Sequence, residues 1–218
     1  MIKAIIFDFD GLIIDTETAM YNSWNDTYKR YGCSLPLSKW EKSVGSFNPL
    51  FNPYEYLSEL LEKKIDKETV RCERRSRFAE LLKNIDLLPG VKDYILKSKE
   101  LGLKLAIASS SSKEWVVTYL EKFKIDFYFD TIICSDHVKQ IKPFPDIYQM
   151  VLAQLNISNT EAIALEDSPN GCLSAKQAGI YCVAIPNNLT KHFSFGNADL
   201  QINSLYEVPL NKLLIMID

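Results

Sequence analysis

The chain has 218 residues, of which 47% are hydrophobic and 24% are charged, and its net charge at neutral pH is −3. These values are typical of a globular protein that buries a sizeable core. The slight excess of acidic residues gives no general affinity for nucleic acid or for an anionic membrane, and no apolar stretch is long enough to cross a bilayer.

The positions of the cysteines and histidines argue against a disulfide framework and against a zinc site. The five cysteines are scattered and no pair has CxxC spacing, which is typical of reduced thiols in a cytoplasmic protein. The two histidines, His137 and His192, are far apart, which argues against a zinc site. Residues 1–4 lead directly into a predicted strand, without the layout of a signal peptide. We therefore expect a cytoplasmic protein, and a monomer as the simplest state.

The most informative stretch lies near the N-terminus, where residues 5–12 read Ile-Ile-Phe-Asp-Phe-Asp-Gly-Leu. A short apolar run that stops at a turn residue predicts a buried strand. Residues two apart in a strand share a face, so Asp8 and Asp10 are expected to lie side by side, with Phe9 opposite. Adjacent carboxylates repel unless a cation or a shared proton lies between them, so the pair indicates chemistry rather than packing.

A helical segment follows the first strand. Asp15 and Thr16 are candidate N-caps for a helix that would end before Gly32. Residues 16–87 mix aromatic and charged residues at helical spacing and contain no strand-like run. This pattern predicts a small helical domain over residues 16–87, inserted into a core that consists of residues 1–15 and 88–218.

Beyond the helical segment, apolar strands alternate with helical patterns. The predicted strands are 104–108, 131–134, 162–165, 181–185 and 200–202. Such alternation predicts an α/β fold, with a Rossmann-like parallel sheet and helices on both faces. In these sheets, ligands bind beyond the carboxyl ends of the strands.

Polar side chains gather at those predicted carboxyl ends. They are Asp8, Asp10, Ser109, Ser110, Lys142, Glu166 and Asp167. Converging carboxylates suit Mg²⁺, which prefers oxygen ligands, and a lysine with hydroxyl donors beside Mg²⁺ would bind a phosphate group. We therefore predict a Mg²⁺ site formed by the four acids, with Ser109, Ser110 and Lys142 binding phosphate.

These residues also suggest a reaction. A carboxylate in line with a bound phosphate can act as a nucleophile and form an aspartyl-phosphate. A second acid can protonate the leaving alcohol and later activate water. Taken singly, each motif could be a loop, a turn or a helix cap. Their joint position at strand ends favours the functional interpretation.

In this order, the motifs resemble the haloacid dehalogenase-like hydrolase superfamily, and most closely its β-phosphoglucomutase-like phosphatase branch. The matching motifs are Asp8-Phe9-Asp10-Gly11, Ser109 after a buried strand, Lys142-Pro143 before a helix, and Glu166-Asp167-Ser168 with Gly171. The resemblance implies that Asp8 is the nucleophile, that Asp10 is the general acid and base, and that Lys142 completes the catalytic set. It also implies that Mg²⁺ is held by Asp8, the backbone carbonyl of Asp10 and Asp167, next to Glu166, under a helical cap.

The substrate is inferred from two departures from this family pattern. Mutase members look to carry a histidine near Met20 and an arginine near residues 45–48, and this chain has neither. The arginines at positions 71, 74, 75 and 77 are expected to form mostly a solvated helix face. A mutase must hold a second phosphate, so the missing cations favour hydrolysis. We expect a Mg²⁺-dependent phosphatase of small phosphorylated metabolites, with sugar phosphates favoured.

Two other functions stay open. The first is a phosphosugar mutase of the β-phosphoglucomutase type. The second is a receiver-like signalling module, in which an aspartate is phosphorylated but little is catalysed. Its phospho-acceptor would be Asp136, beyond the predicted strand at 131–134. The helical insertion argues against a receiver, because a receiver has no use for a cap.

Overall fold

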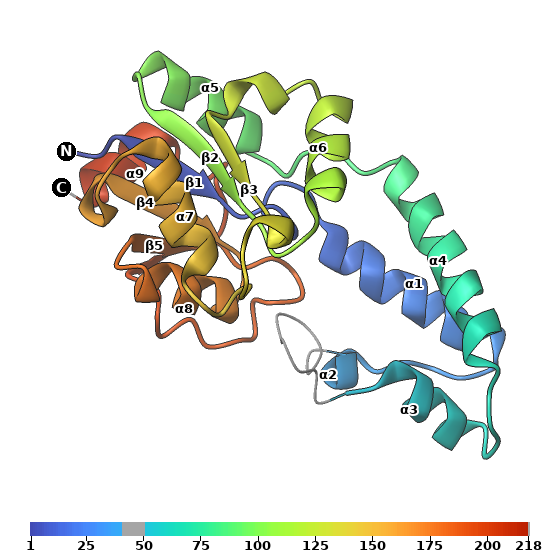
Figure 1. The fold of residues 1–218 in the computed structure, drawn as a ribbon. Coiled ribbons are helices and arrows are strands. Elements are labelled where there is room, and N and C mark those ends of the chain that lie inside the picture. Colours follow the sequence, from blue (N-terminus) through green and yellow to red (C-terminus); the bar gives the residue numbers. More distant parts are fainter. Residues whose placement is uncertain (41–50, 218) are drawn as a thin grey trace.

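The structure is a computed structural model that describes residues 1–40 and 51–217 (Figure 1). The expectation about a missing arginine near residues 45–48 therefore lies outside the described residues. Within the described ranges, none of the helices combines the length and the apolar character that a membrane span requires.

A parallel sheet forms the centre of the molecule, and in the described part of the chain it has six strands in the order β3-β2-β1-β4-β5-β6. The strands are β1 (Ala4–Phe7), β2 (Lys104–Ala108), β3 (Thr131–Ile133), β4 (Ala162–Glu166), β5 (Tyr181–Ala184) and β6 (Leu200–Gln201). β1 lies between β2 and β4, and Phe7 is level with Ile107 and Leu165. The residues that follow these three strands therefore emerge together at one edge of the sheet.

Helices cover both faces of the sheet (Figure 1). One face packs on α5 (Val91–Glu100), α6 (Lys113–Lys122) and α9 (Leu210–Ile217), and the other packs on α7 (Asp146–Leu155) and α8 (Pro169–Gln177). Successive residues of a strand point to opposite faces, so Ile5 and Phe7 join the first cluster and Ala4 and Ile6 the second. Strands that are apolar on both sides are what a doubly covered parallel sheet requires.

Four helices lie together to one side of the sheet (Figure 1). They are α1 (Thr16–Arg30), α2 (Leu37–Trp40), α3 (Pro53–Leu60) and α4 (Lys67–Lys83), and we call them the helical group. As expected, Asp15 caps α1, because its Oδ1 accepts the Thr18 N–H at 2.9 Å. The group has its own buried cluster, which includes Trp24, Tyr28 and Leu57.

The segment that leaves the sheet for the helical group lies beside the segment that returns from it. Ile14 forms an antiparallel bridge with Leu87, and the Leu88 N–H donates to the Ile13 carbonyl at 2.9 Å. The two segments that join the sheet to the helical group are therefore paired. The division into domains at residues 15 and 88 stays a prediction, and this pairing lies next to both of its boundaries.

Candidate active site

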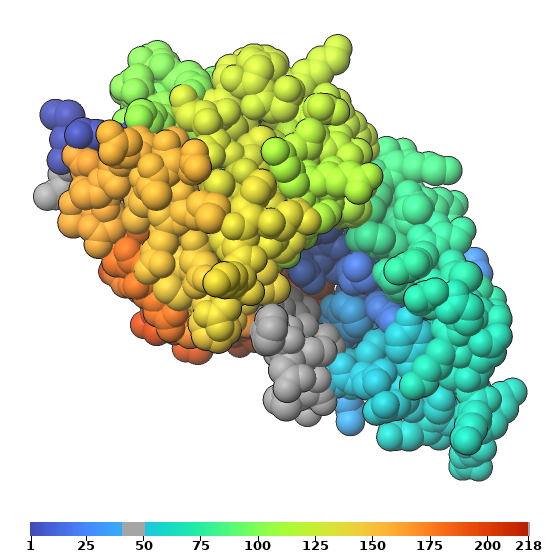
Figure 2. Space-filling view, viewed as in Figure 1, coloured from blue at the N-terminus to red at the C-terminus, as the bar shows by residue number. Residues whose placement is uncertain are grey.

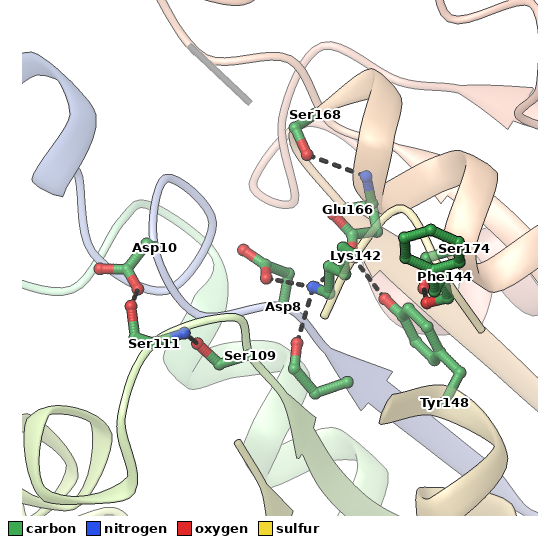
Figure 3. Close-up of polar contacts among 12 residues, drawn as sticks. Asp8, Asp10, Ser109, Ser111, Lys142, Phe144, Tyr148, Glu166, Ser168 and Ser174 are labelled. Carbon is green, nitrogen blue, oxygen red and sulfur yellow. Dashed lines mark hydrogen bonds and ion pairs between the residues drawn. The ribbon is translucent and has the colours of Figure 1, made fainter. Parts of the chain in front are cut away.

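A buried lysine joins three neighbouring strands at their carboxyl ends (Figure 3). The Nζ atom of Lys142 donates to Asp8 Oδ1 at 2.5 Å, to Glu166 Oε1 at 2.6 Å and to the carbonyl of Ala108 at 2.7 Å. Because β1 lies in register between β2 and β4, the three acceptors are level with one another. The predicted convergence of Asp8, Lys142 and Glu166 is thus present in the structure.

The surroundings of Lys142 leave an excess of negative charge. The lysine side chain is only 6% exposed, and it reaches the site from the loop before α7. Tyr148 of α7 donates its hydroxyl to Glu166 Oε1 at 2.5 Å. One ammonium group therefore faces two carboxylates, and Asp167, which is also buried, adds a third.

The pKa values of these groups follow from burial and from their neighbours. Burial raises the pKa of Asp8 to about 8, with the Lys142 ammonium opposing the rise and Glu166 adding to it. Burial, Asp8 and Glu166 together raise the pKa of Asp167 well above its usual range. Burial favours neutral Lys142, but Asp8 and Glu166 outweigh it and raise the lysine pKa. The site is therefore short of positive charge.

Three carboxylates are placed to hold a cation. Asp8, Glu166 and Asp167 each offer one oxygen, and the three oxygens lie within 4.8 Å of one another. Glu166 Oε2 is buried and accepts no hydrogen bond from the described residues. Gly171 makes room for this oxygen, since a Cβ at Gly171 would lie 1.8 Å from it. Converging hard oxygens with one buried atom unsatisfied fit Mg²⁺.

Asn187 orients Asp167, although no motif in the sequence pointed to it. Its Nδ2 donates to Asp167 Oδ2 at 2.7 Å and to the Gly11 carbonyl at 3.4 Å. Its Oδ1 accepts the N–H groups of Leu189 and Thr190 at 2.9 and 3.1 Å. Leu189 belongs to the buried cluster of the helical group. The only available signal was the position of Asn187 just after a strand that ends at a proline.

Asp10 lies apart from the carboxylate cluster. Its Oδ1 accepts from Thr16 Oγ1 at 2.8 Å and from Trp115 Nε1 at 2.9 Å, and its Oδ2 accepts from Ser111 Oγ at 2.6 Å. Figure 3 shows its carboxylate turned toward Ser111 and away from Asp8. Phe9 lies opposite Asp8 as expected, in the buried cluster that contains Ile5 and Phe7. Asp10 adds to the burial that raises the pKa of Asp8, although the two carboxylates have separate hydrogen-bond partners. The predicted metal contact of Asp10 concerns its backbone carbonyl and stays a prediction.

The two serines predicted to bind phosphate follow β2. Ser109 is buried, and its Oγ accepts the backbone N–H of Ser111 at 3.0 Å, while Ser110 is half-buried beside it. Within the described ranges, no hydrogen bond joins either serine to Lys142 or Asp8. Their role toward phosphate stays a prediction, although the loop starts at the same edge of the sheet as Asp8.

Arg74 is not part of a solvated helix face. Its Nη1 lies 3.0 Å from Met20 Sδ, and its guanidinium lies over the rings of Trp24 and Phe78. Its Nε is buried and has no hydrogen-bond partner among the described residues. The structure therefore brings a cation to Met20, the position where the sequence analysis noted a missing histidine.

The acid of the receiver-like alternative lies elsewhere. Asp136 Oδ2 accepts the backbone N–H of Lys113 at 2.5 Å, at the start of α6, and Asp136 is not part of the carboxylate cluster. Asp136 is thus not among the acids that are placed to hold a cation. The space-filling view shows a hollow between the part of the molecule that contains the sheet and the helical group (Figure 2).

Comparisons with known proteins all point to the same protein family. The family model described as haloacid dehalogenase-like hydrolase matches residues 5–185. YhcW of Bacillus subtilis is 41% identical over 214 residues, which cover 98% of this chain and 97% of that protein. The phosphorylated carbohydrates phosphatase of Thermotoga maritima is 33% identical over 182 residues, with 82% of each chain covered. The crystal structure of CbbY from Rhodobacter sphaeroides in complex with phosphate is 30% identical, has a TM-score of 0.75, and matches over 98% of this chain and 99% of that chain.

Proposed function

Because the chain belongs to the haloacid dehalogenase-like hydrolase family and is a phosphatase of its β-phosphoglucomutase-like branch, we propose that it hydrolyses small phosphate monoesters with the help of Mg²⁺ and through an aspartyl-phosphate on Asp8. The observation that carries the proposal is the buried Lys142 between Asp8 and Glu166, with Asp167 alongside. Three carboxylates around one ammonium leave a negative excess that a divalent cation would offset.

Asp8, Glu166 and Asp167 would hold Mg²⁺, with the backbone carbonyl of Asp10 as a further ligand. The unsatisfied Oε2 of Glu166 and the raised pKa values of Asp8 and Asp167 support a cation at this place. When bound, Mg²⁺ would supply positive charge to the phosphate oxygens and keep the neighbouring carboxylates ionised.

The protein's own residues would divide the reaction into two steps. In the first, an Asp8 oxygen attacks phosphorus, the bond from phosphorus to the alcohol oxygen breaks, and the Asp10 carboxyl gives its proton to that oxygen. In the second, water attacks the aspartyl-phosphate, Asp10 takes up the water proton, and Asp8 is released. Lys142 would neutralise the phosphoryl oxygens, and Ser109 and Ser110 would donate hydrogen bonds to them.

We assign residues 16–87 to a cap that closes over the substrate and excludes bulk water. The hollow beside the site and the paired crossing at Ile14 and Leu87 support this role. Sugar phosphates are the favoured substrates because a relative is named as a phosphatase of phosphorylated carbohydrates. The phosphosugar mutase is the second candidate, because Arg74 supplies a cation at Met20 and β-phosphoglucomutases are among the structural neighbours.

A panel of phosphate monoesters, assayed with Mg²⁺ and with EDTA, tests the proposal. We expect the protein to release phosphate from sugar phosphates in the presence of Mg²⁺ but not in EDTA. The Asp8→Asn variant should lose this activity, and the Asp136→Asn variant should keep it. No turnover of any ester, or full turnover in Asp8→Asn, would overturn it. Conversion of β-glucose 1-phosphate to glucose 6-phosphate in the presence of the glucose bisphosphate, without phosphate release, would favour the mutase.

A further inference from the structure

One buried tyrosine contacts both a carboxylate of the cluster and the lysine beside it. Tyr148 of α7 is fully buried, and its hydroxyl donates to Glu166 Oε1 at 2.5 Å. Figure 3 shows this hydroxyl directed toward the glutamate. The Nζ atom of Lys142 lies 5.3 Å from the centroid of the Tyr148 ring and donates to the same glutamate oxygen at 2.6 Å. The reaction proposed above gives this tyrosine no role.

The two carboxylate oxygens of Glu166 have unequal surroundings. Oε1 accepts from Lys142 and from Tyr148, and these two donors occupy the two lone pairs of a carboxylate oxygen. Oε2 is buried and accepts no hydrogen bond from the described residues. The backbone of α8 lies against the carboxylate, since a Cβ at Gly171 would lie 1.8 Å from Oε2 and 2.4 Å from Oε1. Glu166 can therefore offer one oxygen to a cation, and bringing Oε1 to the cation as well would break both hydrogen bonds.

The other two acids of the cluster follow the same pattern. Asp8 Oδ1 accepts from Lys142 at 2.5 Å, and Asp167 Oδ2 accepts from Asn187 at 2.7 Å. In the part of the chain that the structure describes, the second oxygen of each accepts no hydrogen bond. Mg²⁺ binds in octahedral geometry and keeps several waters, whereas Ca²⁺ takes about six to eight oxygens and can bind both oxygens of a carboxylate. A cluster in which each acid offers one oxygen therefore suits Mg²⁺ better than Ca²⁺.

We propose that Tyr148 is a positioning residue, which holds Glu166 Oε1, fixes Glu166 as a ligand through one oxygen, and so makes the cluster favour Mg²⁺ over Ca²⁺. The inference rests on the proposed function, in which Glu166 helps to hold Mg²⁺. Lys142 divides the three N–H groups of its ammonium among Asp8, the Ala108 carbonyl and Glu166, so it has no second donor for the glutamate. The tyrosine hydroxyl supplies that second donor.

The test measures metal binding rather than turnover. Tyr148→Phe removes the hydroxyl and keeps the ring beside Lys142. Isothermal titration of the metal-free protein with Mg²⁺, and separately with Ca²⁺, gives two affinities, and the wild type should bind Mg²⁺ more tightly. In the variant, Glu166 keeps one donor and can turn, so Mg²⁺ loses a fixed ligand while Ca²⁺ can take both carboxylate oxygens. We expect the ratio of Mg²⁺ affinity to Ca²⁺ affinity to fall about tenfold, the lower end of the effect of groups that hold metal ligands.

A matched variant and a second measurement complete the experiment. Tyr94→Phe, in α5, also removes a buried hydroxyl, one that donates to the Val208 carbonyl, and it should leave the affinity ratio unchanged. Thermal unfolding with each metal is the second measurement, because a metal that binds the folded protein raises Tm even in a less stable variant. In Tyr148→Phe, the increase in Tm caused by Mg²⁺ should shrink relative to the increase caused by Ca²⁺.

The outcomes separate this inference from the proposed function. A wild-type affinity ratio in Tyr148→Phe would overturn the positioning role, and so would an equal fall of the ratio in Tyr94→Phe. Equal affinities of the wild type for Mg²⁺ and Ca²⁺ would overturn the preference for Mg²⁺. A wild type that binds neither metal would contradict the proposed function itself.

Discussion

Asn187 donates a side-chain N–H to Asp167 Oδ2 at 2.7 Å, so a loop that follows β5 orients an acid that follows β4. The same side chain bonds the Gly11 carbonyl and the backbone of its own loop. Since Leu189 of this loop is buried with the helical group, Asn187 connects a proposed metal ligand to both the first strand's loop and the helical group.

Removing that amide should weaken Mg²⁺ binding. Residues that orient metal ligands are worth about tenfold to hundredfold in affinity, and we expect a loss in this range for Asn187→Ala. Isothermal titration of the metal-free protein with Mg²⁺ measures it. Asn188→Ala, at the exposed neighbouring position, is the control and should bind as the wild type does. Equal affinities in the two variants would contradict the assignment.

Lys142 should contribute strongly to stability when no metal is bound. Replacing it by methionine leaves Asp8 and Glu166 buried without their partner, and we expect the free energy of unfolding to fall by roughly 3–5 kcal/mol. Urea unfolding in EDTA measures the change. Lys176→Met breaks a more exposed pair with Asp199 and should cost less than about 1 kcal/mol. Adding Glu166→Gln to Lys142→Met should restore part of the loss, because one buried charge is removed.

Gly171→Ala should damage the site although alanine favours a helix. Gly171 lies within α8, where alanine would otherwise stabilise by about 1 kcal/mol. The new Cβ would lie 1.8 Å from Glu166 Oε2, so the carboxylate must leave its place beside Lys142. We expect a lower melting temperature and a loss of activity. Gly196→Ala meets only Ser194 Oγ at 3.7 Å and should change neither. Wild-type activity in Gly171→Ala would show that Glu166 can move freely.

Glu17 should make stability depend on pH. Burial, with Asp10 and Asp15 adding to it, raises the pKa of Glu17 from 4.5 to about 7. Between these values the folded protein holds a proton that the unfolded chain has released, so this contribution to stability falls as pH rises from about 4.5 to 7. Glu17→Gln should remove the part of the fall that Glu17 causes and be more stable than the wild type at pH 8 by roughly 1–3 kcal/mol, with little difference near pH 4.5.

Thermal or urea unfolding across that pH range, in EDTA, measures the effect of Glu17→Gln. Glu68→Gln changes an exposed glutamate in the first turn of α4 and serves as the control. Glu68 is exposed and pairs with Arg71, whereas Glu17 has Asp10 and Asp15 as charged neighbours, so only Glu17→Gln should change the pH profile. Parallel pH profiles for wild type and Glu17→Gln would contradict a raised Glu17 pKa.

Local patterns in the amino-acid sequence were enough to predict most of the strands and part of the site. The five strands predicted after residue 100 are present, each within a residue of its expected ends, and Asp15 caps α1, because strand runs and caps depend on neighbouring residues. The first strand ends earlier than expected, at Phe7. The convergence of Asp8, Lys142 and Glu166 also followed, since parallel strands bring their carboxyl ends to one edge. Helix α9 was missed, because a short apolar run does not distinguish helix from strand.

The partners of Asp10, Asp167 and Met20 depend on contacts between residues that are far apart in the sequence. Trp115 reaches Asp10 across 105 positions, Asn187 reaches Asp167 across 20, and Arg74 reaches Met20 across 54. Such contacts depend on how helices and loops pack against the sheet, and periodicity and capping carry no information about that packing. Local chemistry therefore specified the acids and the lysine, whereas packing specified the side chains that orient them.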